Sequence, residues 1–496
     1  MNRLHKKLIR LAAVVFFGVS LLSCGSDYEY SYLYKGLPFE MEKVHRPYIP
    51  PRSINVEDFG AKGDGVTMNT AYFEDAIEVL SQNGGGRLVV SKGLWLTGPL
   101  TLKDNIELHL TSDAVLVFAA TINEEGYGQA MIKAEGASDV AITGNGIIDG
   151  NADAVRPVSR DMVTPAQWRK LIQKGGVTNR KGDMWYPDST SYRGAVLSPV
   201  VYMDNCKNVL IEGCIFRNTP SDAVYTSMSK DLIIDGVSVV NPVCSHGCDG
   251  VVFDSCEDML VMNSSFDGVS DAVCVIAGNV RDGQDAASPS RNLMADNCEV
   301  FNAEAGFVIG GVVTGGVQNV SVSDCRFIGT GAGLLFKSSR GSGGMVENIY
   351  ASDLIMKDTP SASILVDVYL DGASASESVP YDIDYVPTYE STPHLRNIQI
   401  SGVISNGAAR AVYFNGIPEM NIENIVLQNC EMTAEKGVDL RYVSGVVMKN
   451  VHITQTDSLG YVLANCKNVV LHNCQDADND ARPSVMQYNS ENVVID

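Results

Sequence analysis

A short pattern of polar and apolar positions recurs along most of the 496-residue chain. Each copy has a polar pair that ends in Asn or Asp, then alternating apolar residues, then Gly or Asn, as in residues 207–213 and 230–236. The alternation predicts one short, half-buried strand in each copy. Successive copies start 18 to 34 residues apart, except for two longer intervals, after Asp139 and after Asn348, which indicate insertions.

One short strand in each period of this length is typical of a solenoid. Such strands cannot bury a face alone, so successive coils must stack on one another. A β-sandwich or a propeller is the alternative, but a propeller blade needs about four strands and roughly 40–50 residues. The spacing therefore favours an all-β fold, a right-handed parallel β-helix. The recurring Asn predicts left-handed turns and ladders of side-chain amides.

A short helix is expected near the N-terminal end of the solenoid. Asn69 or Thr70 can cap it, and its apolar positions between Phe73 and Leu80 form one face, which we expect to cover the end of the core. The glycine-rich loop at residues 60–65 lacks the lysine and the Ser or Thr of a P-loop. We interpret that loop as structural.

The insertion at residues 151–200 contains a second predicted helix, which Thr164 can cap. Three aromatic residues of the insertion are compatible with two roles. They can form sugar-stacking platforms in a groove, or they can pack the insertion onto the β-helix. These residues are Trp168, Trp185 and Tyr186.

Residues 1–23 predict a signal peptide, with a basic start, a short apolar run and small residues at its end. A transmembrane anchor is the alternative, but an apolar run of this length is short for a bilayer. The sequence before Cys24 resembles a bacterial lipobox, which implies lipid on Cys24, a tether over residues 24–51 and a β-helix domain over residues 52–496. We expect an exported lipoprotein, in the periplasm or at the surface of a bacterium with an outer membrane, that meets the membrane only through its lipid.

The formal net charge is −22. Such a surface repels nucleic acid and anionic membranes, so neither is an expected partner, and binding of acidic sugars would need a local basic patch. Eleven cysteines follow Cys24, and most recur with the repeat, which predicts a buried ladder of small residues. Cys244 and Cys248 are close enough in sequence for a disulfide in an exported protein. We expect no metal site, no cofactor and a monomer.

The candidate chemistry centres on residues 244–278. Asp249 and Asp271 each lie in a turn of small residues, 22 positions apart, close to one period of the repeat. Equivalent positions in a parallel β-helix stack about 4.8 Å apart, so these two carboxylates should be neighbours. Stepping by one coil in both directions predicts a column of ionisable side chains, formed by Asp222, Asp249, Asp271, Glu304 and Lys337.

Several motifs together resemble glycoside hydrolase family 28, the polygalacturonase family, over roughly residues 54–495. They are DFGAKGDG with its helix and LTGP, GIIDG, CKNVLIEG with FRNTP, the CDG turn at Asp249, VSDAVCVIAG, AGFVIGG, GLLFKSSRG with GGMVENIY, and GIPEMNIENI. The resemblance implies a pectin-lyase-like β-helix and inverting hydrolysis of pectic polysaccharide, either galacturonan or rhamnogalacturonan. Inverting hydrolysis uses a carboxylic acid and a carboxylate base about 6.5–9.5 Å apart.

The resemblance implies that Asp249 and Asp271 activate the attacking water. Four residues are the candidates for substrate binding: Lys337, Arg340, Tyr369 and His246. Other expected groups of the family are absent from the matching positions. The general acid position holds Ser270, which cannot act as a proton donor of tuned pKa.

Three further positions depart from the family pattern. Ala305, beside Glu304, stands at the histidine of the Gly-His-Gly turn, Leu335 at the arginine of the Arg-x-Lys strand, and Ile276 at the lysine after the Asp-Asp turn.

Three functions are compatible with this site. In the first, the chain is a hydrolase in which Glu304 or Asp222 replaces the missing acid, and the loss of cations favours a less acidic glycoside, such as a rhamnose-containing or branched pectic unit. In the second, the chain is a catalytically impaired relative that binds pectic glycans. In the third, it is a β-helix lyase, which would need a Lys or Arg base and a calcium site made of acids.

Overall fold

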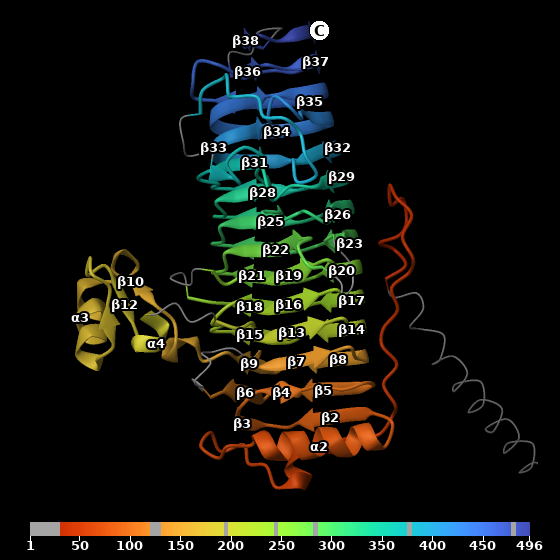
Figure 1. The fold of residues 1–496 in the computed structure, drawn as a ribbon, viewed down its shortest axis with the longest axis vertical. Helices are drawn as coiled ribbons and strands as arrows, with labels where there is room; N and C mark the ends of the chain where they lie inside the picture. Colours follow the sequence, from red (N-terminus) through yellow and green to blue (C-terminus); the bar gives the residue numbers. More distant parts are fainter. Residues whose placement is uncertain are drawn as a thin grey trace, which may run out of the picture.

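The computed structural model describes residues 30–119, 130–192, 197–242, 247–280, 286–373, 379–477 and 483–496. It shows a right-handed parallel β-helix whose coils stack into one long column (Figure 1). The predicted fold class is confirmed. Three positions from the sequence predictions lie outside the described residues, namely Cys24, Cys244 and His246.

The strands form three faces, which we name A, B and C, and each strand pairs in parallel with its equivalents one coil before and after. Face A contains β4 (Leu100–Thr101), β7 (Ile132–Glu135), β13 (Val201–Asp204), β16 (Val224–Ser227), β19 (Val251–Asp254), β22 (Asp271–Ile276), β25 (Ala305–Ile309), β28 (Ala332–Lys337), β31 (Ala362–Asp367), β36 (Tyr461–Ala464) and β38 (Val485–Tyr488). Face B contains β1 (Ser53–Asn55), β2 (Gly86–Val90), β5 (Ile106–Leu110), β8 (Ser138–Gly144), β14 (Lys207–Glu212), β17 (Lys230–Asp235), β20 (Glu257–Met262), β23 (Ser290–Asp296), β26 (Val317–Ser323), β29 (Met345–Ser352), β32 (His394–Ser401), β35 (Val443–Gln455), β37 (Lys467–His472) and β39 (Glu491–Ile495). Face C contains β3 (Gly93–Thr97), β6 (Ala114–Phe118), β9 (Ile147–Asp149), β15 (Ile215–Arg217), β18 (Ser238–Val240), β21 (Ser265–Asp267), β24 (Glu299–Phe301), β27 (Arg326–Ile328) and β30 (Ile355–Lys357). Three longer strands run through corners: β33 (Ile404–Asn415) from face C to face A, β34 (Ile422–Arg441) from face B through face C to face A, and β35 from face B to face C.

The predicted asparagine ladder is present along the strands of face B. Asn292, Asn319, Asn348 and Asn397 all have positive φ angles, and each of the last three donates its side-chain amide to the one before, at 2.9 to 3.2 Å. Asn tolerates the left-handed region better than most residues, so one residue type serves both the turn and the ladder. The predicted burial of the repeating cysteines is also confirmed, because Cys206, Cys214, Cys256, Cys298, Cys325, Cys430, Cys466 and Cys474 are all buried, free thiols.

The helix α2 (Thr70–Gln82) covers the N-terminal end of the column with its buried Phe73, Ala76, Ile77 and Leu80 (Figure 1). The predicted side-chain cap does not form. Asn69 is buried instead and holds the glycine-rich loop, because its Oδ1 accepts the Lys62 N–H at 2.8 Å and its amide donates to the Lys62 carbonyl. The structural interpretation of that loop is therefore confirmed. A short 3₁₀ turn, η2 (Val56–Phe59), precedes it.

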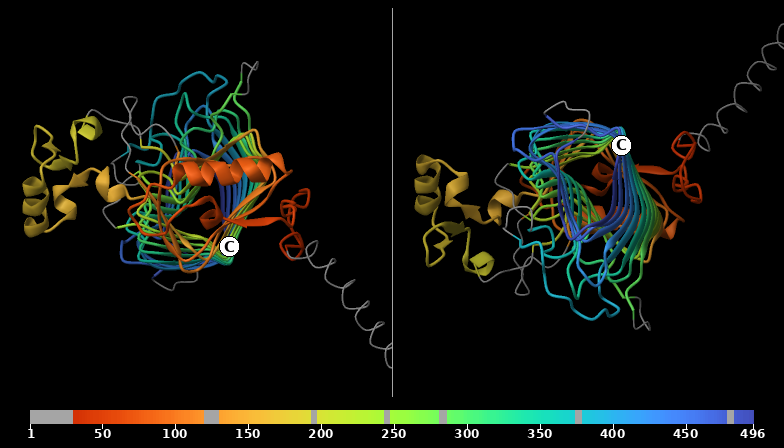
Figure 2. Two further views of the ribbon diagram at one scale, coloured as in Figure 1. Left: turned by 90° about the horizontal axis from the view of Figure 1, so that it is seen from below. Right: turned by 90° about the horizontal axis from the view of Figure 1, so that it is seen from above.

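Residues 30–50 form a strap that runs along the outside of face B (Figures 1 and 2). Tyr30 and Val44 are buried in a cluster with outward-facing apolar residues of that face, among them Leu210 and Ile233. Arg46 reinforces the strap through a bidentate ion pair with Glu212 at 2.7 Å. The expectation of a free tether is therefore wrong for this part of the chain, although the domain limits themselves stay a prediction. Among the described residues, no helix has the length and apolar character needed to span a bilayer.

The insertion forms a small module that stands away from the column (Figures 1 and 2). It consists of η3 (Ala152–Ala154), β10 (Val158–Ser159), η4 (Arg160–Met162), α3 (Pro165–Lys174), β11 (Val177–Thr178), β12 (Met184–Tyr186) and α4 (Ser189–Tyr192), with β12 at the centre of a three-stranded sheet. Thr164 caps α3 as predicted, with Gln167 completing a capping box. Trp185 is buried and donates to the Gly175 carbonyl, so it packs the module itself rather than a sugar groove.

Candidate active site

Three aspartates stack on consecutive coils at the turn that leads from face C into face A. The pairing of Val224 with Val251, and of Val251 with Val273, places Asp222, Asp249 and Asp271 in one register. Backbone bonds join the three turns, because the Ala223 N–H donates to the Asp249 carbonyl and the Gly250 N–H donates to the Asp271 carbonyl. The N-terminal part of the predicted column is therefore present.

The first two carboxylates of this stack each also accept the backbone N–H of the next aspartate. Asp222 Oδ1 accepts the Asp249 N–H at 3.1 Å, and Asp249 Oδ1 accepts the Asp271 N–H at 3.0 Å. Asp271, only 7% exposed, receives the Lys337 ammonium at 3.3 Å on its Oδ2. Carboxylate oxygens of Asp249 and Asp271 and the Cys274 sulfur all lie within 4.8 Å of one another.

Burial and mutual repulsion push the proton affinities of the three acids upward and apart. Burial raises the pKa of Asp222 to about 6, with a smaller contribution from the Asp271 charge. Burial, then the charges of Asp271 and Asp222, raise the pKa of Asp249 to about 8. Burial also raises the pKa of Asp271, but the Lys337 ammonium opposes this shift. Acids with separated pKa values and one fixed cation can divide proton donation and proton acceptance between them.

The predicted column is wrong at its other two positions. Ala305, not Glu304, pairs with Asp271, so Glu304 is displaced by one residue and is exposed at the turn. Lys337 lies at the far end of its strand, where it pairs with Asp367. Its long side chain, rather than its backbone position, brings it to Asp271. Counting by repeat length misplaces both residues because the strands start at different points of successive copies.

Ser270, at the position where the family resemblance places the general acid, has a structural role. Its Oγ accepts the Gly247 N–H at 2.8 Å and the Cys248 N–H at 3.3 Å. The hydroxyl is 6% exposed and fastens the turn that carries Asp249 to the turn that carries Asp271. The serine thus fixes two of the acids without itself having an acidic proton.

Arg340 and Tyr369 do not reach the acids. The Arg340 guanidinium forms an ion pair with the buried Glu419 carboxylate, at 2.9 Å for the outer nitrogen, and lies 5.6 Å from the centre of the Tyr369 ring. Its third contact is the Asp384 carbonyl. These contacts hold the segment after β31 in place, so the structure gives no support to a substrate-binding role for either residue.

Residues 379–393 cover face A on the C-terminal side of the site. The Arg441 guanidinium donates to the Val379 carbonyl at 2.8 Å, and the Asn465 amide donates to the Tyr381 carbonyl at 2.7 Å. Beneath this segment Tyr413, an outward-facing residue of face A, is only 1% exposed. The surface beside the acids is therefore closed in this direction.

Face A carries aromatic side chains on the N-terminal side of the acids. The Tyr202 and Tyr225 rings stack across neighbouring coils with centres 5.9 Å apart. A pocket of about 530 Å³ lies beside them, and Ser227 and Asn279 are among its lining residues. Stacked rings next to polar side chains suit the faces and hydroxyls of sugars.

An apolar row runs beside the acids, three residues further along each strand. It includes Val252, Cys274, Val308 and Leu335, which belong to one outer hydrophobic cluster. Leu335 stands where the resemblance places a substrate-binding arginine. The contact surface next to the acids is therefore apolar at the point where a galacturonate carboxylate would be bound.

Arg156 is a buried cation near the site that the sequence did not single out. It is 5% exposed and donates to the Thr219 carbonyl at 2.8 Å, in the turn that leads to Asp222. Burial raises the pKa of the Cys248 thiol to about 11, and the Arg156 charge is the largest opposing influence. No sequence signal marks this arginine, because its position depends on how the insertion leaves the coil.

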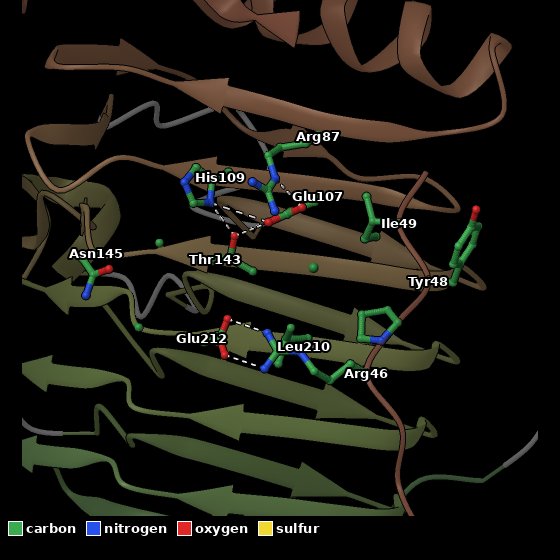
Figure 3. Close-up of a pocket in the computed structure, with 14 residues that line it drawn as sticks. Arg46, Tyr48, Ile49, Arg87, Glu107, His109, Thr143, Asn145, Leu210 and Glu212 are labelled. Atoms are coloured by element: carbon green, nitrogen blue, oxygen red, sulfur yellow. Dashed lines mark hydrogen bonds and ion pairs between the residues drawn. The ribbon is translucent and has the colours of Figure 1, made fainter. Parts of the chain in front are cut away.

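A second polar pocket, of about 550 Å³, lies on face B where the strap meets the first coils (Figure 3). Arg87 donates to Glu107 at 2.7 Å, Thr143 donates to the other oxygen of Glu107, and Arg46 pairs with Glu212. Its charged groups therefore satisfy one another. We interpret this network as the attachment of the strap and the first coils.

The chain is a parallel β-helix protein that carries a stack of carboxylates on one face. Residues 82–437 match the glycosyl hydrolases family 28, and the chain belongs to that family. It is 27% identical over 399 residues to a probable polygalacturonase of Vitis vinifera, covering 76% of this chain and 73% of the relative. It is 23% identical to an exo-poly-alpha-D-galacturonosidase of Dickeya chrysanthemi, covering 85% and 74% of the two chains. The structure of a hyperthermoactive exopolygalacturonase from Thermotoga maritima aligns with a TM-score of 0.64 at 25% identity, over 82% of this chain and 94% of that one.

Proposed function

We propose that this chain hydrolyses glycosidic bonds of galacturonan-type pectic polysaccharide with an altered set of acids. The observation that carries the proposal is the stack of Asp222, Asp249 and Asp271, which ends in an ion pair with Lys337. Membership of family 28 and the likeness to polygalacturonases supply the substrate class.

In the proposed mechanism Asp271 is the base. The Lys337 ammonium favours its carboxylate form, so that it can take a proton from the attacking water. Asp222 is the acid and protonates the leaving glycosidic oxygen. The two acids are two coils apart, about 9–10 Å, near the spacing of inverting enzymes. Asp249 and Asp271 lie too close together for an inverting pair, since their oxygens are within 4.8 Å.

Binding of pectic glycans without hydrolysis is the second candidate. Ser270, Ala305 and Leu335 favour it, because each replaces a polar group that the family resemblance assigns to catalysis or binding. A lyase is less well supported, since both cations that it could use as a base, Lys337 and Arg340, are engaged in ion pairs.

Release of reducing ends from a panel of pectic substrates tests the proposed function. We expect hydrolysis of a galacturonan or rhamnogalacturonan polymer, with the anomer opposite to that of the substrate as the first product in proton NMR. No product from any polymer, together with measurable binding, would establish the glycan-binding alternative. Absorbance of an unsaturated sugar would instead indicate a lyase, and a retained anomer would transfer the catalytic roles to Asp249 and Asp271.

We also propose, from the sequence alone, that the chain is exported and lipidated at Cys24. The basic start, the short apolar run and the residues before Cys24 support this proposal. Expression in a bacterium should give a mature chain that begins at Cys24 and carries acyl groups, as measured by mass spectrometry of its first peptide. Cys24→Ala should abolish the acylation, and an unprocessed N-terminus in the natural sequence would refute the proposal.

A further inference from the structure

The inserted module has an unusual concentration of positive charge. Residues 152–192 contain seven Lys and Arg and four acids, Asp153, Asp161, Asp183 and Asp188, in a chain whose net charge is −22. Six of the seven cations, all except the buried Arg156, are exposed, and none of these six forms an ion pair with an acid in the described parts of the chain. They are Arg160, Arg169, Lys170, Lys174, Arg180 and Lys181.

Five of the six exposed cations lie in two parts of the module, the helix α3 and the hairpin between β11 and β12. Arg169, Lys170 and Lys174 lie on α3, the helix farthest from the column in both views (Figures 1 and 2). Arg180 and Lys181 lie in the hairpin between β11 and β12. Trp168 is half-buried, and the Arg160 guanidinium lies 5.9 Å from the centre of its ring. The module therefore presents positive charge with an aromatic ring among it.

The module begins and ends at the coil that precedes the acids. On the way out, the Gly150 N–H donates to the Arg217 carbonyl. On the way back, the Val200 N–H donates to the Asp222 carbonyl at 2.9 Å. The insertion thus replaces the turn between faces C and A that in the next three coils carries Asp222, Asp249 and Asp271. It is attached directly to the N-terminal end of the acid stack.

We propose that this module is a docking arm for a polyanionic polysaccharide, which holds a long galacturonate chain beside the acids. The polymer named here rests on the proposed function, but the requirement for a polyanion comes from the module's charge. Several clustered cations attract a polyanion strongly at low ionic strength, and salt weakens this attraction. The arm also explains how a protein of such negative charge, with an apolar row at its site, can recruit an acidic polymer.

The test compares two triple variants of the full chain, each with Asp271→Asn to prevent turnover. The first variant carries Arg169→Glu, Lys170→Glu and Lys174→Glu. The matched control carries Lys436→Glu, Lys449→Glu and Lys467→Glu, three exposed cations of the last coils with the same change in charge. Binding of polygalacturonate polymer and of trigalacturonate is measured by calorimetry at low and high salt.

We expect the module variant to lose about tenfold or more in affinity for the polymer at low salt, with a flatter salt dependence. The control variant should bind the polymer nearly as the parent does, and trigalacturonate binding should be the same in all three proteins. Equal losses in both variants, or unchanged polymer binding in the module variant, would overturn the proposal. So would module-dependent binding to phosphatidylglycerol vesicles without binding to the polymer. If the polymer binds through the module but the natural chain cleaves nothing, the proposed function fails and the docking arm stands.

Discussion

Asp271→Asn is expected to lower kcat on galacturonan by about 10³-fold, within the usual range for removal of a general base. An amide cannot take the proton from water, although it fills nearly the same space. Asp271 is the acid whose carboxylate form the Lys337 ammonium favours, so it is the proposed base. Its loss should therefore reduce catalysis more than the loss of substrate contacts would. Initial rates of reducing-end release measure the effect. KM should change little, because the substitution removes a proton acceptor rather than a sugar contact.

Two further variants isolate the role of the base. Asp353→Asn is the matched control, since Asp353 is exposed at a turn with a positive φ angle, which Asn tolerates well. It should leave kcat unchanged. Lys337→Met removes the charge that opposes the upward shift in the pKa of Asp271, so the acidic limb of the pH profile should move to higher pH. Full activity of Asp271→Asn would show that another group activates the water.

The fold could be predicted from the sequence because its rules are local. An alternating strand and an Asn in the left-handed region are enough to specify the coil that each copy forms. Stacking then repeats this arrangement along the column. The same regularity correctly predicts that Asp222, Asp249 and Asp271 are neighbours. It failed at Glu304 and Lys337, where the strand begins at a different point of the copy.

Long-range contacts are the part that the sequence could not supply. The pairing of Arg340 with Glu419 joins positions 79 residues apart, and that of Arg46 with Glu212 joins positions 166 apart. Neither pair has a motif, because the partners are chosen by how a loop or strap crosses the finished column. The sequence therefore predicts a substrate-binding role for Arg340 and a tether where the structure has the strap.

Asp222→Asn is expected to reduce kcat/KM on a natural pectic polymer by about 10²- to 10³-fold, whereas Glu304→Gln should change it by less than about threefold. Among the three acids of the stack, Asp222 is the one that combines a pKa raised by burial with a two-coil separation from Asp271. Because burial raises the pKa of Asp222 to about 6, its donor form is present below that pH and is lost as the pH rises through it. The alkaline limb of the kcat/KM profile should therefore fall near pH 6.

The pH at which the alkaline limb of the kcat/KM profile falls distinguishes Asp222 from Asp249 as the proton donor. If Asp249 were the acid, its pKa of about 8 would move the alkaline limb to about pH 8, and Asp249→Asn would abolish it. A substrate with a nitrophenyl leaving group, which needs little protonation, should restore much of the activity of Asp222→Asn but not that of Asp271→Asn. A large loss in Glu304→Gln with an unchanged Asp222→Asn would assign proton donation to the exposed turn instead. The proposed proton donor and the proposed base both belong to the acid stack. Comparing these variants therefore determines which carboxyl group of the stack has replaced the general acid that is missing at Ser270.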